Sequence, residues 1–128
     1  MKRGNNQPTA RELDILNVLW QRGPSSVRQV RDAMSTSESD HAYTTILTLM
    51  QIMVDKGLAT RDETARTHVY AAAVSRPDVE TAVVGDVITR LFGGSGFALA
   101  AKAVEVSLSP SDRQRLKELL ADLEEGGR

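Results

Sequence analysis

Uncharged polar side chains cluster at the start of the segment at residues 43–57, which reads YTTILTLMQIMVDKG. Hydroxyl and amide groups over successive helical turns can touch the edges of bases. A Thr methyl can pack on a thymine methyl, and a Gln amide can form two hydrogen bonds with adenine. The candidates for such contacts are Tyr43, Thr44, Thr45, Thr48 and Gln51. The alternative interpretation is that these are solvated positions on an ordinary amphipathic helix.

The other side of the same segment is apolar at the spacing of one helical face, which predicts that it packs inward. Its members are Ile46, Leu49, Met50, Met53 and Val54. Gly57 follows them and is typical of a left-handed helix end. We interpret the segment as the recognition helix of a winged helix-turn-helix.

Two helices are predicted before this segment, because each begins with the spacing of a capping box. The first box is Thr9 to Glu12 and the second is Ser26 to Gln29. Arg28 lies in the first turn of the second helix, which in a helix-turn-helix meets the DNA backbone with its free N–H groups. We therefore expect Arg28 to contact phosphate. A solvated surface charge is the alternative.

A polar hairpin is predicted after the recognition helix, from short strand-like runs at 58–61 and 67–71. Such a hairpin is a wing. Arg66 at its tip is the first candidate for insertion beside or into a minor groove, and Arg61 is the second. The alternative is an ordinary solvated hairpin tip.

Residues 76–128 predict three helices with much aliphatic surface. A segment of this size cannot form a good core alone. We expect it to pack on a second copy of the chain, because a reader of DNA with one recognition helix gains affinity and site length as a dimer. The residues expected in that contact are Val87, Leu91, Leu116, Leu119, Leu120 and Leu123. The alternative is that these helices fold back onto the winged helix as one monomeric core.

The expected fold is therefore mainly α with a small β-hairpin wing. An N-terminal winged helix-turn-helix (residues 1–75) precedes a C-terminal three-helix dimerisation region (residues 76–128).

Composition narrows the function classes. The chain of 128 residues has a net charge of −1 and no Cys, which excludes disulfides, thiol catalysis and cysteine metal sites. Residues 1–76 carry ten Lys or Arg against eight Asp or Glu, whereas residues 77–128 carry six against nine. This asymmetry permits a DNA-binding first half without requiring one. We expect no metal and no cofactor.

No secretory signal or bilayer-length apolar run is present, so the expected location is the cytoplasm.

With these segments assigned, the sequence resembles the penicillinase-repressor family of bacterial transcription regulators. The resemblance rests on PTARELDILNVLWQRGPSSVRQV at 8–30, AYTTILTLMQIMVDKGLATR at 42–61, ARTHVYAAAVSR at 65–76 and, more weakly, RLFGGS at 90–95. It implies a homodimer that represses genes by binding palindromic double-stranded operators, often in β-lactam response. It also implies a membrane-bound sensor protease as a partner. In the best-known members that protease triggers cleavage of an Asn-Phe bond. The corresponding place here is near Lys102 and Ala103, where that pair is absent.

Two other classes of function compete with a repressor. A winged helix can serve as a protein–protein interaction module without operator binding, although such modules typically lose the polar helix face and the wing arginines. An enzyme is not expected, because the sequence contains no nucleophile–base set, phosphate-binding loop or metal cluster.

Overall fold

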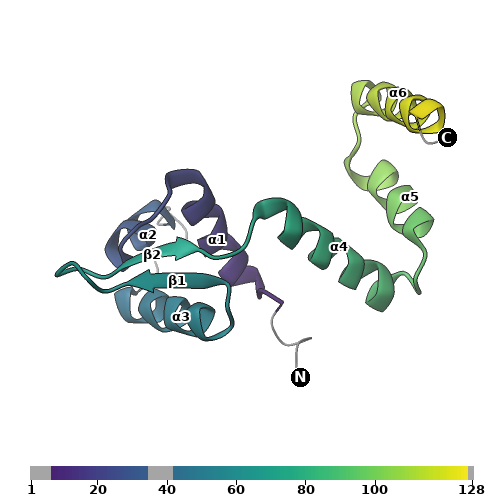
Figure 1. Ribbon diagram of the computed structural model, residues 1–128. Coiled ribbons are helices and arrows are strands. Elements are labelled where there is room, and N and C mark those ends of the chain that lie inside the picture. The colour runs from purple at the N-terminus through teal and green to yellow at the C-terminus, as the bar shows by residue number, and fades with distance from the viewer. Residues whose placement is uncertain (1–6, 35–41, 127–128) are drawn as a thin grey trace. The chain divides into compact units, whose positions relative to one another are not determined.

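A computed structural model of the chain describes residues 7–34 and 42–126 (Figure 1). The elements in chain order are α1 (Ala10–Arg22), α2 (Val27–Met34), α3 (Tyr43–Asp55), β1 (Ala59–Asp62), β2 (Val69–Ala72), α4 (Arg76–Leu91), α5 (Gly96–Ser107) and α6 (Pro110–Gly126). The chain divides into two compact units, residues 1–83 and 84–128, and the division falls within α4. The expected fold class, a winged helix followed by a helical region, is confirmed.

The helices of the first unit begin where their capping residues lie. Thr9 Oγ1 accepts from the Glu12 amide at 3.2 Å, and Glu12 Oε1 accepts from the Thr9 amide at 2.9 Å. Ser26 and Gln29 form the same reciprocal pair at the start of α2, at 2.9 and 3.2 Å. Each pair satisfies two amides that a helix start leaves without partners, so both predicted helix starts are confirmed.

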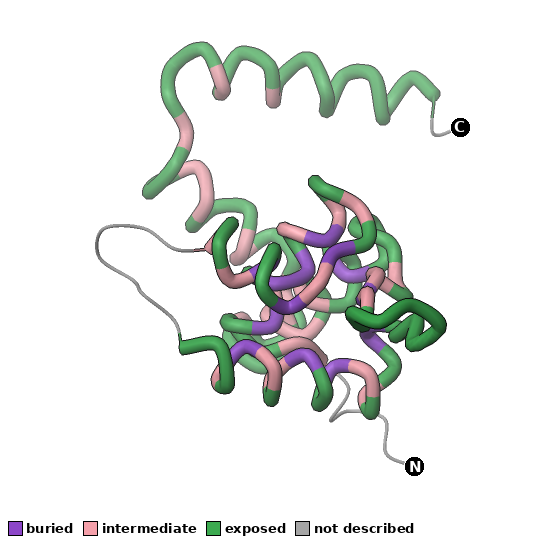
Figure 2. The backbone as a smooth tube through the Cα atoms, turned by 90° about the vertical axis from the view of Figure 1, so that its left-hand side faces the viewer, coloured by how far each residue is buried: buried purple, intermediate pink, exposed green. Residues whose placement is uncertain are grey.

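The core of the first unit is mainly aliphatic and is drawn from α1, α2, α3, the hairpin and the start of α4 (Figure 2). From α3 it takes Ile46, Met50 and Met53, which are fully buried, while Leu49 and Val54 of the predicted inward stripe are half-buried. The remaining buried apolar residues are Ile15, Leu16, Leu19, Val27, Val30, Leu58, Ala59, Tyr70 and Val79. The inward face of α3 thus leaves its opposite face to solvent.

The wing is an antiparallel hairpin of β1 and β2, in register from Ala59↔Ala72 to Asp62↔Val69. One further bridge joins it to the turn between α1 and α2. The Ser25 amide donates to the Tyr70 carbonyl at 2.9 Å, and the Tyr70 amide donates to the Ser25 carbonyl at 2.8 Å. Both residues are about 1% exposed. The hairpin is therefore fixed against the helix-turn-helix.

A buried ion pair joins the start of α1 to the end of α3. Lys56 Nζ lies 2.7 Å from Glu12 Oε1, with side-chain exposures of 18% and 3%. Lys56 also donates to the Gln7 carbonyl at 3.0 Å. Glu12 thus has two roles, because the oxygen that caps α1 also accepts from Lys56. The sequence pattern indicated only the first role.

The second unit has a different character. Its helices have local caps, with Ser95 accepting from the Ala98 amide and Ser109 pairing reciprocally with Asp112. Neither α5 nor α6 contains a buried residue (Figure 2). Large apolar side chains are instead exposed, up to 81% for Phe97. Residues 84–126 thus form no core of the kind that stabilises the first unit.

Across residues 7–34 and 42–126, no single helix is long and apolar enough to cross a membrane; α4 and α5 reach that length and composition only when taken together across the bend between them.

Removing the Glu12 carboxylate should destabilise the protein strongly. We expect Glu12→Ala to lower the free energy of unfolding by about 3 kcal/mol, because it leaves the Lys56 ammonium without its buried partner. Chemical denaturation measures this. The exposed Glu80→Ala in α4 is the matched control and should change stability by less than about 0.5 kcal/mol. Equal effects of the two substitutions would contradict a structural role for the ion pair.

Candidate nucleic-acid interface

The exposed face of α3 is a stripe of uncharged polar residues. Thr44, Thr48 and Gln51 are exposed at i, i+4 and i+7, opposite the buried side of the helix. Tyr43 and Thr45 lie at the two edges of this stripe, the former 43% exposed and the latter half-buried. The five predicted base-contacting residues therefore lie on the side of α3 that does not pack in the core.

A groove of about 770 Å³ borders one edge of the stripe. It lies between the first turn of α2, the start of α3 and the hairpin. The groove brings together Arg28, Tyr43 and Arg66, which the sequence predicted separately, and adds Leu47 to its lining. Its other lining residues are Ser26, Val27, Gln29, Thr67, His68, Val69 and Tyr70.

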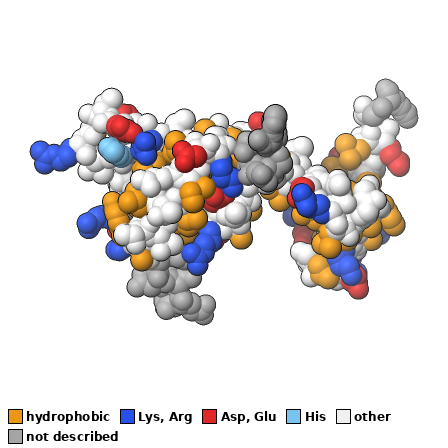
Figure 3. Space-filling view, turned by 90° about the horizontal axis from the view of Figure 1, so that it is seen from below, with side chains coloured by type: hydrophobic (Ala, Val, Ile, Leu, Met, Phe, Trp, Pro, Cys, Tyr) orange, Lys and Arg blue, Asp and Glu red, His pale blue; other side chains and the backbone are white. Residues whose placement is uncertain are grey.

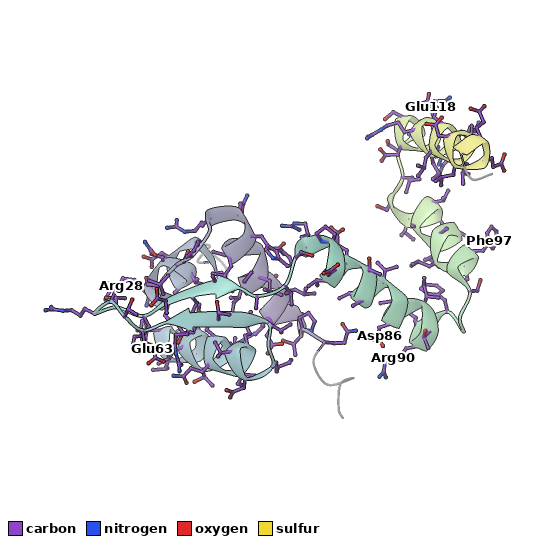
Figure 4. The ribbon with its side chains drawn as sticks, viewed as in Figure 1. Arg28, Glu63, Asp86, Arg90, Phe97 and Glu118 are labelled. Carbon is purple, nitrogen blue, oxygen red and sulfur yellow. The ribbon has the colours of Figure 1, made fainter. Side chains whose placement is uncertain are left out.

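Arg28 and Arg66 are exposed, and within the described parts of the chain neither forms an ion pair. Arg28 projects at the hairpin end of the winged helix (Figure 4). Guanidinium groups in this state can form bidentate hydrogen bonds with an anion such as phosphate. On the face drawn in Figure 3, Lys and Arg side chains lie among acidic, apolar and other polar ones.

Arg61 differs from these two arginines because it has an anionic partner in the wing. Its Nε lies 2.6 Å from Glu63 Oε2. Hydrogen bonding with Tyr70, followed by the Glu63 carboxylate, raises the pKa of Arg61 above its ordinary value. Glu63 therefore partly neutralises the charge that Arg61 could offer to a nucleic acid.

The turn at the wing tip is held by Asp62. Its Oδ1 accepts from the Thr64 amide at 2.9 Å and from Thr64 Oγ1 at 2.7 Å. These two hydrogen bonds favour the ionised form and lower the pKa of Asp62 below its ordinary value.

A second, smaller hollow of about 330 Å³ borders the other edge of the α3 stripe. Thr44, Thr45, Thr48 and Leu49 line it, together with Arg11 from α1. No sequence pattern singled out Arg11, since it lies inside a capping box whose spacing concerns only Thr9 and Glu12. Its position beside α3 follows from helix packing.

The residues expected in dimerisation lie in the second unit and are mostly exposed. Leu91 is 73% exposed, and Leu119, Leu120 and Leu123 on α6 are 51%, 53% and 59% exposed. Val87 and Leu116 are half-buried. Phe97, which was not among the predicted contact residues, also projects away from α5 (Figure 4).

The two residues predicted to lie near a cleavage site are inside α5. Lys102 is exposed and pairs with Glu105 at 3.1 Å, while Ala103 is half-buried. In residues 7–34 and 42–126, no group of three or more His, Asp or Glu side chains could hold a metal ion.

Comparison with known proteins gives the family. The penicillinase repressor family matches residues 8–122. The transcriptional regulators BlaI from two strains of Mycobacterium tuberculosis are each 32% identical over 117 residues, covering 90% of this chain and 83% of the regulator. A solved structure described as the complex structure of hsRosR-S4 shares the fold, with a TM-score of 0.54 at 17% identity over 98% of both chains.

The chain belongs to the penicillinase repressor family of transcriptional regulators, as the sequence motifs implied. This family is not enzymatic.

Acid should release the turn at the wing tip. The lowered pKa of Asp62 means that its hydrogen bonds to Thr64 are fully present above the unfolded value of 3.8 and are lost as the pH falls through the lower folded value. We expect the Thr64 amide resonance to titrate with a midpoint below 3.8 in an NMR pH series. Asp62→Asn keeps an acceptor oxygen and should abolish the titration. A midpoint at or above 3.8 in the wild type would contradict the assigned hydrogen bonds.

Proposed function

We propose that this protein is a dimeric repressor that binds palindromic operator DNA through α3 and the hairpin wing. The observation that carries the proposal is the exposed polar stripe of α3, together with the adjoining groove that holds Arg28, Tyr43 and Arg66. An uncharged polar helix face suits base edges, and arginines beside it suit the flanking phosphates.

The proposed contacts divide between base reading and backbone binding. Thr44, Thr48 and Gln51 face the bases because they form the exposed stripe of α3. Tyr43 and Thr45, at the two edges of that stripe, contact the walls of the DNA major groove. The backbone and minor-groove contacts come from Arg28 and Arg66, with a smaller contribution from Arg61, whose charge Glu63 partly neutralises.

Dimerisation is proposed for the second unit. Its exposed leucines are costly in water, and the absence of any buried residue in α5 and α6 leaves their apolar surface available to a second copy. A two-fold dimer would present two α3 helices, so we expect a palindromic operator with half-sites about one helical turn apart or a multiple of it. The site of action is then the cytoplasm, where chromosomal DNA is bound, and the regulated genes include those of a β-lactam response.

Control by a membrane-bound sensor protease is part of the proposal. Cleavage near Lys102 and Ala103 requires local unwinding of α5, since both residues are helical. Within a single chain the helix buries no residue, so only its contacts with the second copy oppose unwinding. A cut there would separate α6 from the rest of the chain and remove its leucines from the dimer.

A titration of the purified protein against DNA upstream of its own gene tests the function. In a gel-shift assay, an operator-binding repressor should bind this DNA tightly, with two chains per site, and unrelated competitor DNA should not displace it. Weak binding that competitor DNA abolishes on this and every other genomic fragment would instead favour a protein–protein interaction module.

Substitutions of base-contacting and phosphate-contacting residues should weaken DNA binding in different ways. We expect Thr48→Ala to reduce the preference for operator over scrambled DNA by about 1–3 kcal/mol, because a base contact discriminates between sequences. Arg66→Gln should weaken binding to both duplexes alike and reduce the salt dependence. Fluorescence anisotropy at several salt concentrations measures both, with the exposed Thr81→Ala of α4 as a control. If Thr48→Ala keeps the full preference, the assigned groove face is wrong.

A charge in the α6 stripe should separate the dimer. We expect Leu119→Asp or Leu120→Asp to yield folded monomers that bind the operator poorly, because a buried carboxylate without a partner is costly. Sedimentation measures the mass. Ala121→Asp adds the same charge to another exposed position of α6 and should leave the dimer intact. A dimer in both leucine variants would show that α6 is not the contact.

A further inference from the structure

Arg11 is an exposed cation beside the polar stripe of α3. It is the second residue of α1, and the next residue, Glu12, points into the protein at 2% exposure. Because neighbouring residues on a helix diverge by about 100°, Arg11 points away from that buried pair. In the described part of the chain, Arg11 has no ion-pair partner.

The hollow that Arg11 shares with Thr44, Thr45 and Thr48 lies on the opposite edge of the stripe from the groove that holds Arg28 and Arg66. Leu47 and Tyr43 mark the groove edge of α3, and Thr45 and Leu49 mark the Arg11 edge. The polar stripe is therefore bordered by arginine on both sides, from α1 on one and from α2 and the wing on the other.

Two phosphate backbones form the walls of a DNA major groove, which is about 12 Å wide and admits one helix. A helix lying in that groove has a phosphate strand along each of its edges. Arginine suits such a position, because its planar guanidinium can form bidentate hydrogen bonds with phosphate. We propose that Arg11 binds a backbone phosphate on the groove wall opposite the one that Arg28 contacts. This inference rests on the proposed binding of DNA by α3.

The fold holds Arg11 in that position. The capping box of Thr9 and Glu12 fixes the first turn of α1, and the 2.7 Å ion pair from Glu12 to Lys56 fixes the same turn against the end of α3. Arg11 lies between these two anchored residues and is preorganised, so little ordering of the backbone opposes its contact with phosphate. Together with Arg28 it would set how α3 lies across the groove.

Fluorescence anisotropy of the full-length protein tests this, with a duplex from upstream of its gene and a scrambled duplex of equal length. One phosphate contact contributes about 0.9 to the slope of log affinity against log salt. We expect Arg11→Gln to reduce that slope by about 0.9 and to weaken binding about fivefold at about 0.15 M salt, equally on both duplexes. Arg11→Lys keeps the charge and should restore the slope.

Two controls separate this contact from a change in stability or net charge. Lys117→Gln removes one charge from an exposed position of α6 and should leave the slope unchanged. Arg11→Gln should melt at the wild-type temperature, since its side chain is exposed.

An unchanged slope and affinity in Arg11→Gln, while wild type binds its operator, would overturn the Arg11 contact and leave the proposed function intact. A loss confined to the operator duplex would also overturn it, in favour of a base contact. Wild type that binds neither duplex would overturn the proposed function and this inference with it.

Discussion

Two backbone hydrogen bonds between Ser25 and Tyr70 fix the wing against the helix-turn-helix. Both residues are almost completely buried, so leaving these groups unpaired would cost more than forming the bonds gains. They hold the second strand of the hairpin beside the first turn of α2. The groove that collects Arg28, Tyr43 and Arg66 exists because of that attachment. Without this bridge, the position of Arg66 relative to α3 would not be fixed.

The two units of the chain are stabilised by different means. The first has an aliphatic core and a buried ion pair between Glu12 and Lys56, which ties α1 to α3. The second has well-capped helices but no buried residue in α5 or α6. Helix caps stabilise local structure by about 1 kcal/mol each and cannot replace a core. This difference supports the proposal that the second unit packs on a second copy of the chain.

For the proposed contact with DNA, the positions of individual arginines matter more than the net charge of the protein, which is −1. Arg28, Arg66 and Arg11 border α3 without described ion pairs, whereas Arg61 is held by Glu63. A few positioned guanidinium groups can bind a few phosphates even on a nearly neutral protein, because phosphate contacts act locally and salt screens more distant charges.

The amino-acid sequence by itself determined the local structure and the family. The capping spacings at Thr9 and Ser26 and the apolar face of α3 specified helices within a residue or two, because these signals act within one or two turns. Only the tertiary structure decided which faces meet. The periodicity of apolar residues shows which side of a helix is buried, but it does not show what that side packs against. It therefore could not predict that Glu12 pairs with Lys56, 44 residues away. The approach of Arg11 to Thr48 and the bridge from Ser25 to Tyr70 were hidden for the same reason.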